Sequence, residues 1–134
     1  MAKKFHTVML IDDNEIDNLI NQKMIEAADI TDTIYTHTGA KSAIEFLRNV
    51  ERLEVAEKVL PDAIFLDIDM PLMDGFQFLD EFEKLNNATK KKCSIVMLTS
   101  SINPQDFSRS KKYSSVKLYL NKPLTHESIL KMDI

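Results

Sequence analysis

Short apolar runs recur along the chain, separated by stretches rich in polar residues. Four of them cover residues 8–11, 63–66, 95–98 and 116–120. Continuous apolar runs of about four to eight residues are typical of parallel strands that are covered by helices on both faces. The last run alternates with polar residues, which indicates an edge strand, and the more polar segment 34–38 is expected to form the opposite edge.

The segments between and after these runs carry apolar residues at helical spacing. In the first segment the expected buried face comprises Ile16, Leu19, Ile20, Met24 and Ala27. Later helices are expected around 43–50, 78–85, 103–107 and 125–132. Their starts are indicated by residues that favour helix caps and turns, namely Asn14, Asp74-Gly75, Asn103-Pro104 and Thr125.

The resulting order is a strand followed by a helix, repeated five times. This pattern predicts an α/β fold, (βα)5, with a doubly wound parallel sheet and helices on both faces. Ligands of such sheets bind beyond the carboxyl ends of the strands. We expect one domain over residues 1–134 with no output domain, and we interpret the lysines at 90–92 as a solvated loop.

Composition narrows the function classes. The formal net charge of −4 disfavours non-specific binding to nucleic acid or anionic membranes. Cys93 is the single cysteine, so we expect a reduced, half-buried thiol and no intrachain disulfide. The amino-terminal segment lacks the apolar run and cleavage site of a secretory signal, which predicts a cytoplasmic protein. The three histidines, His6, His37 and His126, are expected at the surface.

Chemically useful side chains follow the predicted strands at the points where they end. They are Asp12 and Asp13, Asp67 and Asp69, Thr99, and Lys122. A single such aspartate often only caps a helix, but several carboxylates at one sheet edge repel one another and require positive charge. Oxygen-only ligands favour Mg²⁺, with Mn²⁺ as an alternative, and a lysine completes the neutralisation. A carboxylate nucleophile, a divalent ion, a hydroxyl and a lysine together fit phosphoryl transfer.

Four segments resemble the receiver domain of the response regulators in bacterial two-component systems. They read LIDDN at 10–14, PDAIFLDIDMPLMDG at 61–75, VMLTS at 96–100 and YLNKP at 119–123. They occur in the family's order and at compatible spacing over most of the chain. The resemblance implies the flavodoxin-like strand order 2-1-3-4-5 of the chemotaxis regulators.

The resemblance also implies a role for each matching residue. Asp67 is the implied phosphoacceptor, and Asp13 and Asp67 the direct Mg²⁺ ligands, while Asp12 acts largely through water and Asp69 through its backbone carbonyl. Thr99 and Lys122 would contact the phosphoryl group, and the bond before Pro123 would be cis. Tyr119 holds the position of a switch aromatic, although half-buried packing on a helix is a competing interpretation.

The implied partners are a sensor histidine kinase or a histidine phosphotransfer protein, and a downstream protein target. That target would contact the face made by the fourth predicted helix, the fifth strand and the last helix. Such a chain is a phosphorylated signalling protein and not a classical enzyme. Whether it is a terminal switch or a relay stays open.

Two departures and one rival interpretation accompany the resemblance. The stretch 39–61 is longer than usual, with residues 51–58 extending the second helix or its loop, and the last helix is short. Asp67-Ile68-Asp69 also fits a phosphohydrolase of the haloacid dehalogenase type. That class carries its Asp-x-Asp on the first strand, however, and leaves Asp12 and Asp13 without a role. Multiple turnover of a phosphate ester would favour it.

Overall fold

A computed structural model describes residues 3–53 and 59–134 of the chain. Strands and helices alternate as the sequence predicts, with one additional short helix. The elements, in chain order, are β1 (Phe5–Ile11), α1 (Glu15–Ala28), β2 (Thr31–His37), α2 (Ala40–Leu53), β3 (Ala63–Leu66), α3 (Gly75–Phe82), α4 (Asn87–Lys92), β4 (Ser94–Thr99), α5 (Pro104–Ser110), β5 (Val116–Asn121) and α6 (His126–Leu130).

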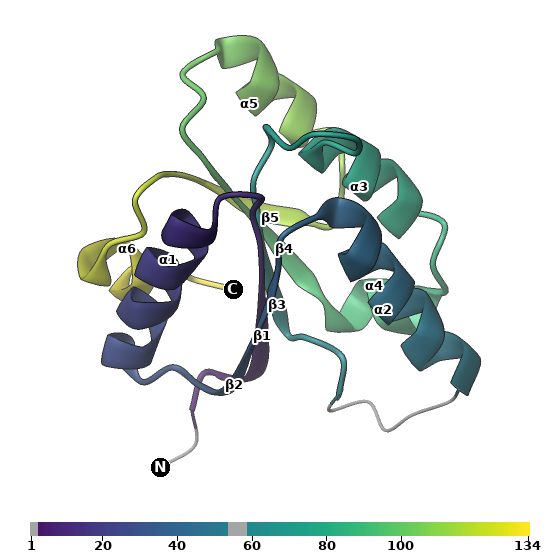
Figure 1. Cartoon of the computed structure of the whole chain (residues 1–134), viewed down its shortest axis with the longest axis horizontal. Coiled ribbons are helices and arrows are strands. Elements are labelled where there is room, and N and C mark those ends of the chain that lie inside the picture. The colour runs from purple at the N-terminus through teal and green to yellow at the C-terminus, as the bar shows by residue number, and fades with distance from the viewer. Residues whose placement is uncertain (1–2, 54–58) are drawn as a thin grey trace.

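The five strands form one parallel sheet in the order β2-β1-β3-β4-β5 (Figure 1). The predicted fold class and strand order are confirmed. In the register of the sheet, Leu66 of β3 lies between Ile11 of β1 and Met97 of β4. The carboxyl ends of the three central strands therefore meet at the same level.

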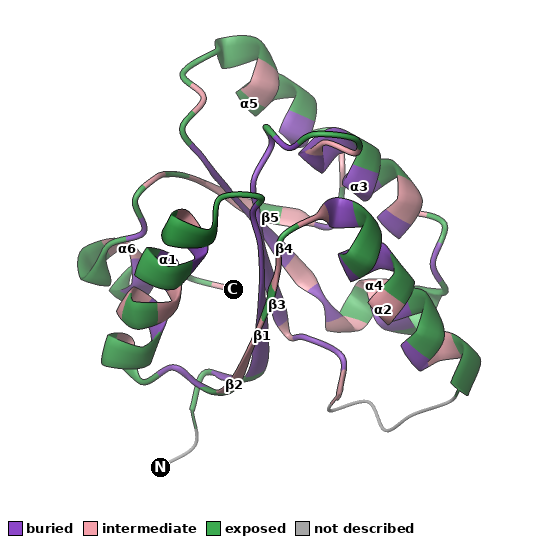
Figure 2. Cartoon of the chain, in the orientation of Figure 1, coloured by how far each residue is buried: buried purple, intermediate pink, exposed green. Residues whose placement is uncertain are grey.

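Helices cover both faces of the sheet. Figure 1 shows α1 and α6 on one side and α2, α3 and α4 on the other. Alternate residues of β1 supply the two cores: Met9 and Ile11 pack with α2 and α3, whereas Val8 and Leu10 pack with α1 and α6. This alternation is the period-two pattern of a strand that is buried on both faces, and the buried residues line both sides of the sheet (Figure 2).

The buried face of α1 differs from the prediction. Ile16, Leu19 and Ile20 are exposed, and the buried stripe consists instead of Asn18, Asn21 and Ile25. The apolar spacing was therefore a correct guide to the helix and a wrong guide to its orientation. The asparagines face inwards because their amides bond backbone groups at the strand ends, as described for the site below.

The three lysines at 90–92 form the last half of helix α4, so the loop predicted for them is wrong. The Asn86 side chain caps this helix by accepting the Thr89 N–H at 2.9 Å. Lysine is a good helix former and is favourable near a helix carboxyl end. Helix α3 accordingly ends at Phe82 and not near Leu85, although Leu85 is buried as expected.

The remaining expectations are met in part. Helix α2 continues to Leu53, which supports a long second helix, and the rest of the predicted extension, 54–58, lies outside the described residues. Helix α6 is short, as predicted. Cys93 is fully and not half buried, and burial raises the pKa of its thiol to about 12. Of the three histidines, His37 is half-buried, and burial lowers its pKa.

Within residues 3–53 and 59–134, no helix has the length and apolar character that crossing a bilayer requires.

Candidate functional site

The candidate site lies where the sheet's hydrogen-bond ladder runs on past the strands. The Asp12 N–H donates to the His37 carbonyl at 3.1 Å, and the Asp67 N–H donates to the Ile11 carbonyl at 3.0 Å. On the other side, the Lys122 N–H donates to the Thr99 carbonyl at 2.8 Å. The backbones of Asp12, Asp67 and Lys122 are thus each fixed by the last residue of a neighbouring strand.

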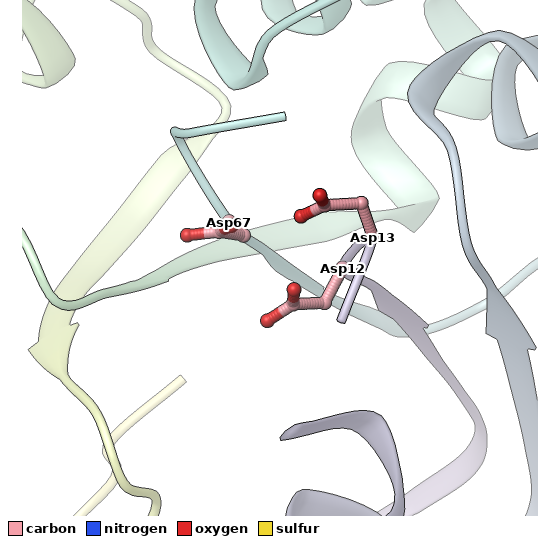
Figure 3. Close-up of side chains that lie close together, drawn as sticks. All are labelled: Asp12, Asp13 and Asp67. Atoms are coloured by element: carbon pink, nitrogen blue, oxygen red, sulfur yellow. The ribbon is translucent and has the colours of Figure 1, made fainter. Parts of the chain in front are cut away.

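Three carboxylates converge at this edge. Asp12 and Asp13 follow β1 and Asp67 follows β3, and each offers an oxygen within 4.8 Å of those of the other two (Figure 3). Asp12 and Asp67 are buried, whereas Asp13 is exposed. The cluster is therefore open to solvent on the side of Asp13.

The ammonium of Lys122 neutralises part of this charge. It lies 2.5 Å from Asp12 Oδ2, 3.0 Å from Asp17 Oδ2 and 3.5 Å from Asp67 Oδ1. Its side chain is 13% exposed. The Lys122–Pro123 peptide bond is cis, as predicted for the bond before Pro123.

Burial and the charge of Asp12 raise the pKa of Asp67 to about 6, against the opposing effect of Lys122. For Lys122, burial disfavours the charged form, yet hydrogen bonds to Asp12 and Asp17 and the charge of Asp67 raise its pKa above the usual value. The lysine is thus firmly protonated, and one ammonium faces more carboxylates than it can balance.

This imbalance fits a divalent cation. Asp12, Asp13 and Asp67 can hold an ion with oxygen atoms alone, and a donor set of carboxylates suits Mg²⁺ or Mn²⁺ better than a metal that prefers nitrogen or sulfur. Asp69 is exposed, two residues beyond Asp67. Of the predicted acids after β1 and β3, the described structure therefore brings Asp12, Asp13 and Asp67 together, and Asp69 is not part of this group.

Within the described residues, neither Thr99 nor Tyr119 makes a side-chain hydrogen bond to Asp67. Thr99 is fully buried, and its Oγ1 accepts the Ser101 N–H at 3.1 Å. The Tyr119 ring meets Phe107 of α5 edge to face at 5.2 Å between centroids. Its hydroxyl is buried and lies next to the Ser101 side chain.

Gly75 shapes the segment after Asp67 in a way that the sequence did not reveal. Its N–H donates to the Ile68 carbonyl at 2.9 Å, which folds the start of α3 back onto that segment. A Cβ atom at this position would lie 2.5 Å from the Asp67 carbonyl oxygen and 2.9 Å from Ile68 Cα. Only glycine fits without moving the backbone of Asp67. From its sequence context, Gly75 is predicted only as part of the Asp74-Gly75 turn.

Three residues of α1 also belong to the site and were missed. Asp17 pairs with Lys122, the Asn18 amide donates to the Asp12 carbonyl at 2.9 Å, and the Asn21 Oδ1 accepts the Leu124 N–H at 3.3 Å. They share one face of the helix with the cap residue Asn14. A polar stripe at spacings of three and four was the available signal.

Comparison with known proteins assigns the chain to a family. The sequence profile of the "Response regulator receiver domain" matches residues 8–132. The chain belongs to this family. It is a phosphoacceptor switch of two-component signalling, and receiver domains are signalling domains and not classical enzymes.

Individual receiver relatives agree. The chain is 31% identical over 122 residues to the sensor histidine kinase CheAY of Helicobacter pylori, a match that covers 91% of the chain and 14% of the kinase. It is 26% identical over 125 residues to the response regulator Rcp1 of Synechocystis, covering 93% of the chain and 82% of that protein.

Solved receiver structures show the same fold. A two-component response regulator from Cytophaga hutchinsonii superposes with a TM-score of 0.84 at 29% identity, over 96% of this chain and 93% of that one. The Mn²⁺-bound form of Rcp1 superposes with a TM-score of 0.72 at 26% identity, over 95% and 88% of the two chains.

Proposed function

We propose that Asp67 is the residue that accepts the phosphoryl group. The observation that carries this assignment is its position: a buried carboxylate at the centre of the sheet, flanked by Asp12 and Asp13 on one side and by Lys122 on the other. Its raised pKa shows how strongly this pocket disfavours uncompensated negative charge. A group that gains a cation and a lysine as partners is suited to a reaction with an anionic donor.

The proposed metal is Mg²⁺, with Mn²⁺ as a substitute, and the Mn²⁺-bound form of the relative Rcp1 supports a divalent ion here. Asp13 and Asp67 would hold it directly, Asp12 largely through water and Asp69 through its backbone carbonyl. When bound, the ion draws charge from the phosphoryl oxygens and brings donor and acceptor together. Asp12 keeps Lys122 beside the acceptor during the same step.

In the proposed transfer, an Asp67 carboxylate oxygen forms a bond to the phosphorus of a phosphohistidine. The phosphorus–nitrogen bond breaks, and its electron pair leaves with the imidazole of the donor. The chain supplies position and charge and no proton, because the attacking group is already a carboxylate above its pKa of about 6. The donor would be a sensor histidine kinase or a histidine phosphotransfer protein in the cytoplasm.

The proposed output surface is made by α5, β5 and α6. Thr99 would donate a hydrogen bond from its hydroxyl group to a phosphoryl oxygen and would shift towards Asp67. This shift would let the Tyr119 ring rotate away from its partner Phe107 on α5. A Tyr119→Ala chain should lose most of the effect of phosphorylation on binding of the downstream protein.

The assignment is tested by incubation with acetyl phosphate, with and without Mg²⁺, followed by intact mass spectrometry and peptide mapping. One phosphoryl group should appear only with Mg²⁺, on Asp67, and should be absent in Asp67→Ala. Asp29→Asn, which changes an exposed acid at the far end of α1, is the matched control and should be phosphorylated normally. Phosphorylation that persists in Asp67→Ala would overturn the assignment.

A further inference from the structure

Lys122 is shared by three carboxylates, and the acceptor is not the nearest of them. Asp12 Oδ2 lies at 2.5 Å, Asp17 Oδ2 at 3.0 Å and Asp67 Oδ1 at 3.5 Å. Hydrogen bonds between an ammonium and a carboxylate are usually about 2.7–2.9 Å long. In this state the two nearest partners of the ammonium are therefore Asp12 and Asp17, and Asp67 is the third.

Asp17 reaches Lys122 from a fixed position on α1. Its N–H donates to the Asn14 side chain at 3.0 Å in the helix cap. Its carboxylate accepts a hydrogen bond from Lys122, which lies 105 positions later in the sequence. The Lys122 backbone is fixed as well, through its bond to Thr99. The ion pair thus ties the amino end of α1 to the segment that follows β5.

An ammonium has three N–H donors, and all three of those of Lys122 already face carboxylates. A phosphoryl group on Asp67 would add oxygen acceptors that carry more negative charge. As the ammonium turns towards them, one existing partner has to weaken.

Asp17 is the partner most easily released. Its side chain is 35% exposed, against 5% for Asp12 and 5% for Asp67, so water can replace the lysine there. A cavity of about 240 Å³ lies next to this ion pair, lined by Asp17, Ile20, Asn21, Ser100, Lys122 and Pro123. It has room for several waters, each of which takes up about 30 Å³.

We propose that Asp17 is a positioning residue that competes with the phosphoryl group on Asp67 for the ammonium of Lys122. The proposal rests on the proposed function of Asp67. Asp17 would weaken binding of a phosphoryl group at Asp67, because each phosphorylation has to draw Lys122 away from the Asp17 carboxylate. Partly exposed ion pairs of this kind change an equilibrium roughly two- to fivefold.

The test measures binding of trifluoroberyllate, a phosphoryl mimic that adds to a carboxylate, to the full chain in saturating Mg²⁺. Bound fluoride is followed by ¹⁹F NMR. Asp17→Asn should lower the half-saturating concentration about two- to fivefold. A merely structural role would lower the melting temperature and leave the affinity unchanged or weaker. Asp17→Ser, which also suits the first turn of a helix, replaces the first variant if that variant does not fold.

Glu15→Gln is the matched control. It removes an acid from the same first turn of α1, and the described residues give Glu15 no contact with Lys122. Its affinity should equal that of the wild type. Equal affinity of Asp17→Asn and wild type, or an equal gain in Glu15→Gln, would overturn the proposal. If the wild type binds no mimic and accepts no phosphoryl group, the proposed function itself fails.

Discussion

Gly75 is a residue at which one added carbon atom reaches the acceptor's own backbone. In Gly75→Ala the new methyl group would meet the Asp67 carbonyl oxygen and Ile68 Cα, neither of which can rotate away. We expect a loss of about 1–3 kcal/mol in the free energy of unfolding, as for other overpacked sites, and slower phosphorylation by acetyl phosphate. Urea unfolding and intact mass spectrometry measure the two effects.

Gly39→Ala is the control, because a Cβ atom there has no neighbour within 4 Å. This variant should be as stable as the wild type or slightly more stable, since alanine restricts the unfolded chain. Equal stability of the two variants would contradict the steric role given to Gly75.

Asp67 should weaken the fold at neutral pH when no metal is bound. Its pKa rises from 3.8 to about 6 on folding, so the folded protein binds this proton more tightly than the unfolded chain does. The penalty is therefore absent below about pH 4 and complete above about pH 6. In a chelating buffer at pH 8, Asp67→Asn should raise the free energy of unfolding by up to about 3 kcal/mol.

Urea unfolding at pH 8, 6 and 4.5 checks this expectation. The gain from Asp67→Asn should shrink as the pH falls, and it should also shrink at pH 8 in excess Mg²⁺, which offsets the same repulsion. A gain that is constant from pH 8 to pH 4.5 would mean that Asp67 is not the source.

Site residues that directly follow apolar strands are predictable from the sequence, because parallel strands bring their ends together whatever the details of packing. Asp17, Asn18 and Asn21 are not, since their contribution depends on how α1 is rotated about its axis. Exposed Ile16 and Leu19 misled that judgement. Gly75 was missed for another reason: a close approach between backbone atoms leaves no mark in a hydrophobic pattern.

At the scale of elements, the cap of α1 connects the helix to the site. The Asn14 side chain accepts the N–H groups of Ile16 and Asp17, and the Asn14 backbone N–H donates to Asp12 Oδ1 at 2.9 Å. Asn14→Ala should cost about 1 kcal/mol of stability. It should also raise the Mg²⁺ concentration needed for half-maximal phosphorylation. The backbone N–H of residue 14 can still donate to Asp12 Oδ1, but the helix start that positions this N–H loses its two cap bonds.

Asn86→Ala is the matched variant, since Asn86 caps α4 with a comparable bond to the Thr89 N–H and is not part of the site. Its stability should fall by a similar amount while its Mg²⁺ requirement stays at the wild-type value. Chemical unfolding and phosphorylation across a Mg²⁺ series separate the two results. A changed Mg²⁺ requirement in both variants would show that the effect is only a general loss of stability.

Helix α4 illustrates what element-level prediction lacked. It has six residues, is not amphipathic, and buries only Thr89, so hydrophobic periodicity does not predict it. The cap at Asn86 and the lysines at its end were the local signals. The strands were easier to predict, because each of the three central ones is buried on both faces.

For the molecule as a whole, Asp62 joins elements at the edge of the sheet opposite the site. Its carboxylate accepts the His6 N–H at 2.6 Å and the Thr7 N–H at 3.1 Å, and it pairs with Lys92 of α4 at 2.5 Å. Burial alone would raise its pKa, but these three partners outweigh burial and lower it. The stability that Asp62 contributes is therefore present at neutral pH and lost as the pH falls below about 4.

Asp62→Ala should destabilise the chain by about 1–3 kcal/mol at pH 7, because it leaves two backbone donors of β1 without this acceptor. Lys92→Ala, which removes only a partly exposed ion pair, should cost less than about 1 kcal/mol. Urea unfolding of both variants at pH 7 and pH 3 tests this order, and the difference between Asp62→Ala and wild type should narrow at the lower pH. Equal losses in the two variants at pH 7 would contradict it.

The hydrogen bonds that extend the sheet's ladder beyond β1, β3 and β4 affect how the site responds to heating. Since the amides of Asp12, Asp67 and Lys122 belong to the same bonded lattice as the strands, they should exchange with deuterium about as slowly as amides in mid-sheet. We therefore expect no local unfolding of the site that leaves the sheet intact. On warming, the chain should accept a phosphoryl group until the sheet unfolds. The midpoint temperature for the loss of phosphorylation should therefore coincide with the midpoint for the loss of the far-ultraviolet circular dichroism signal.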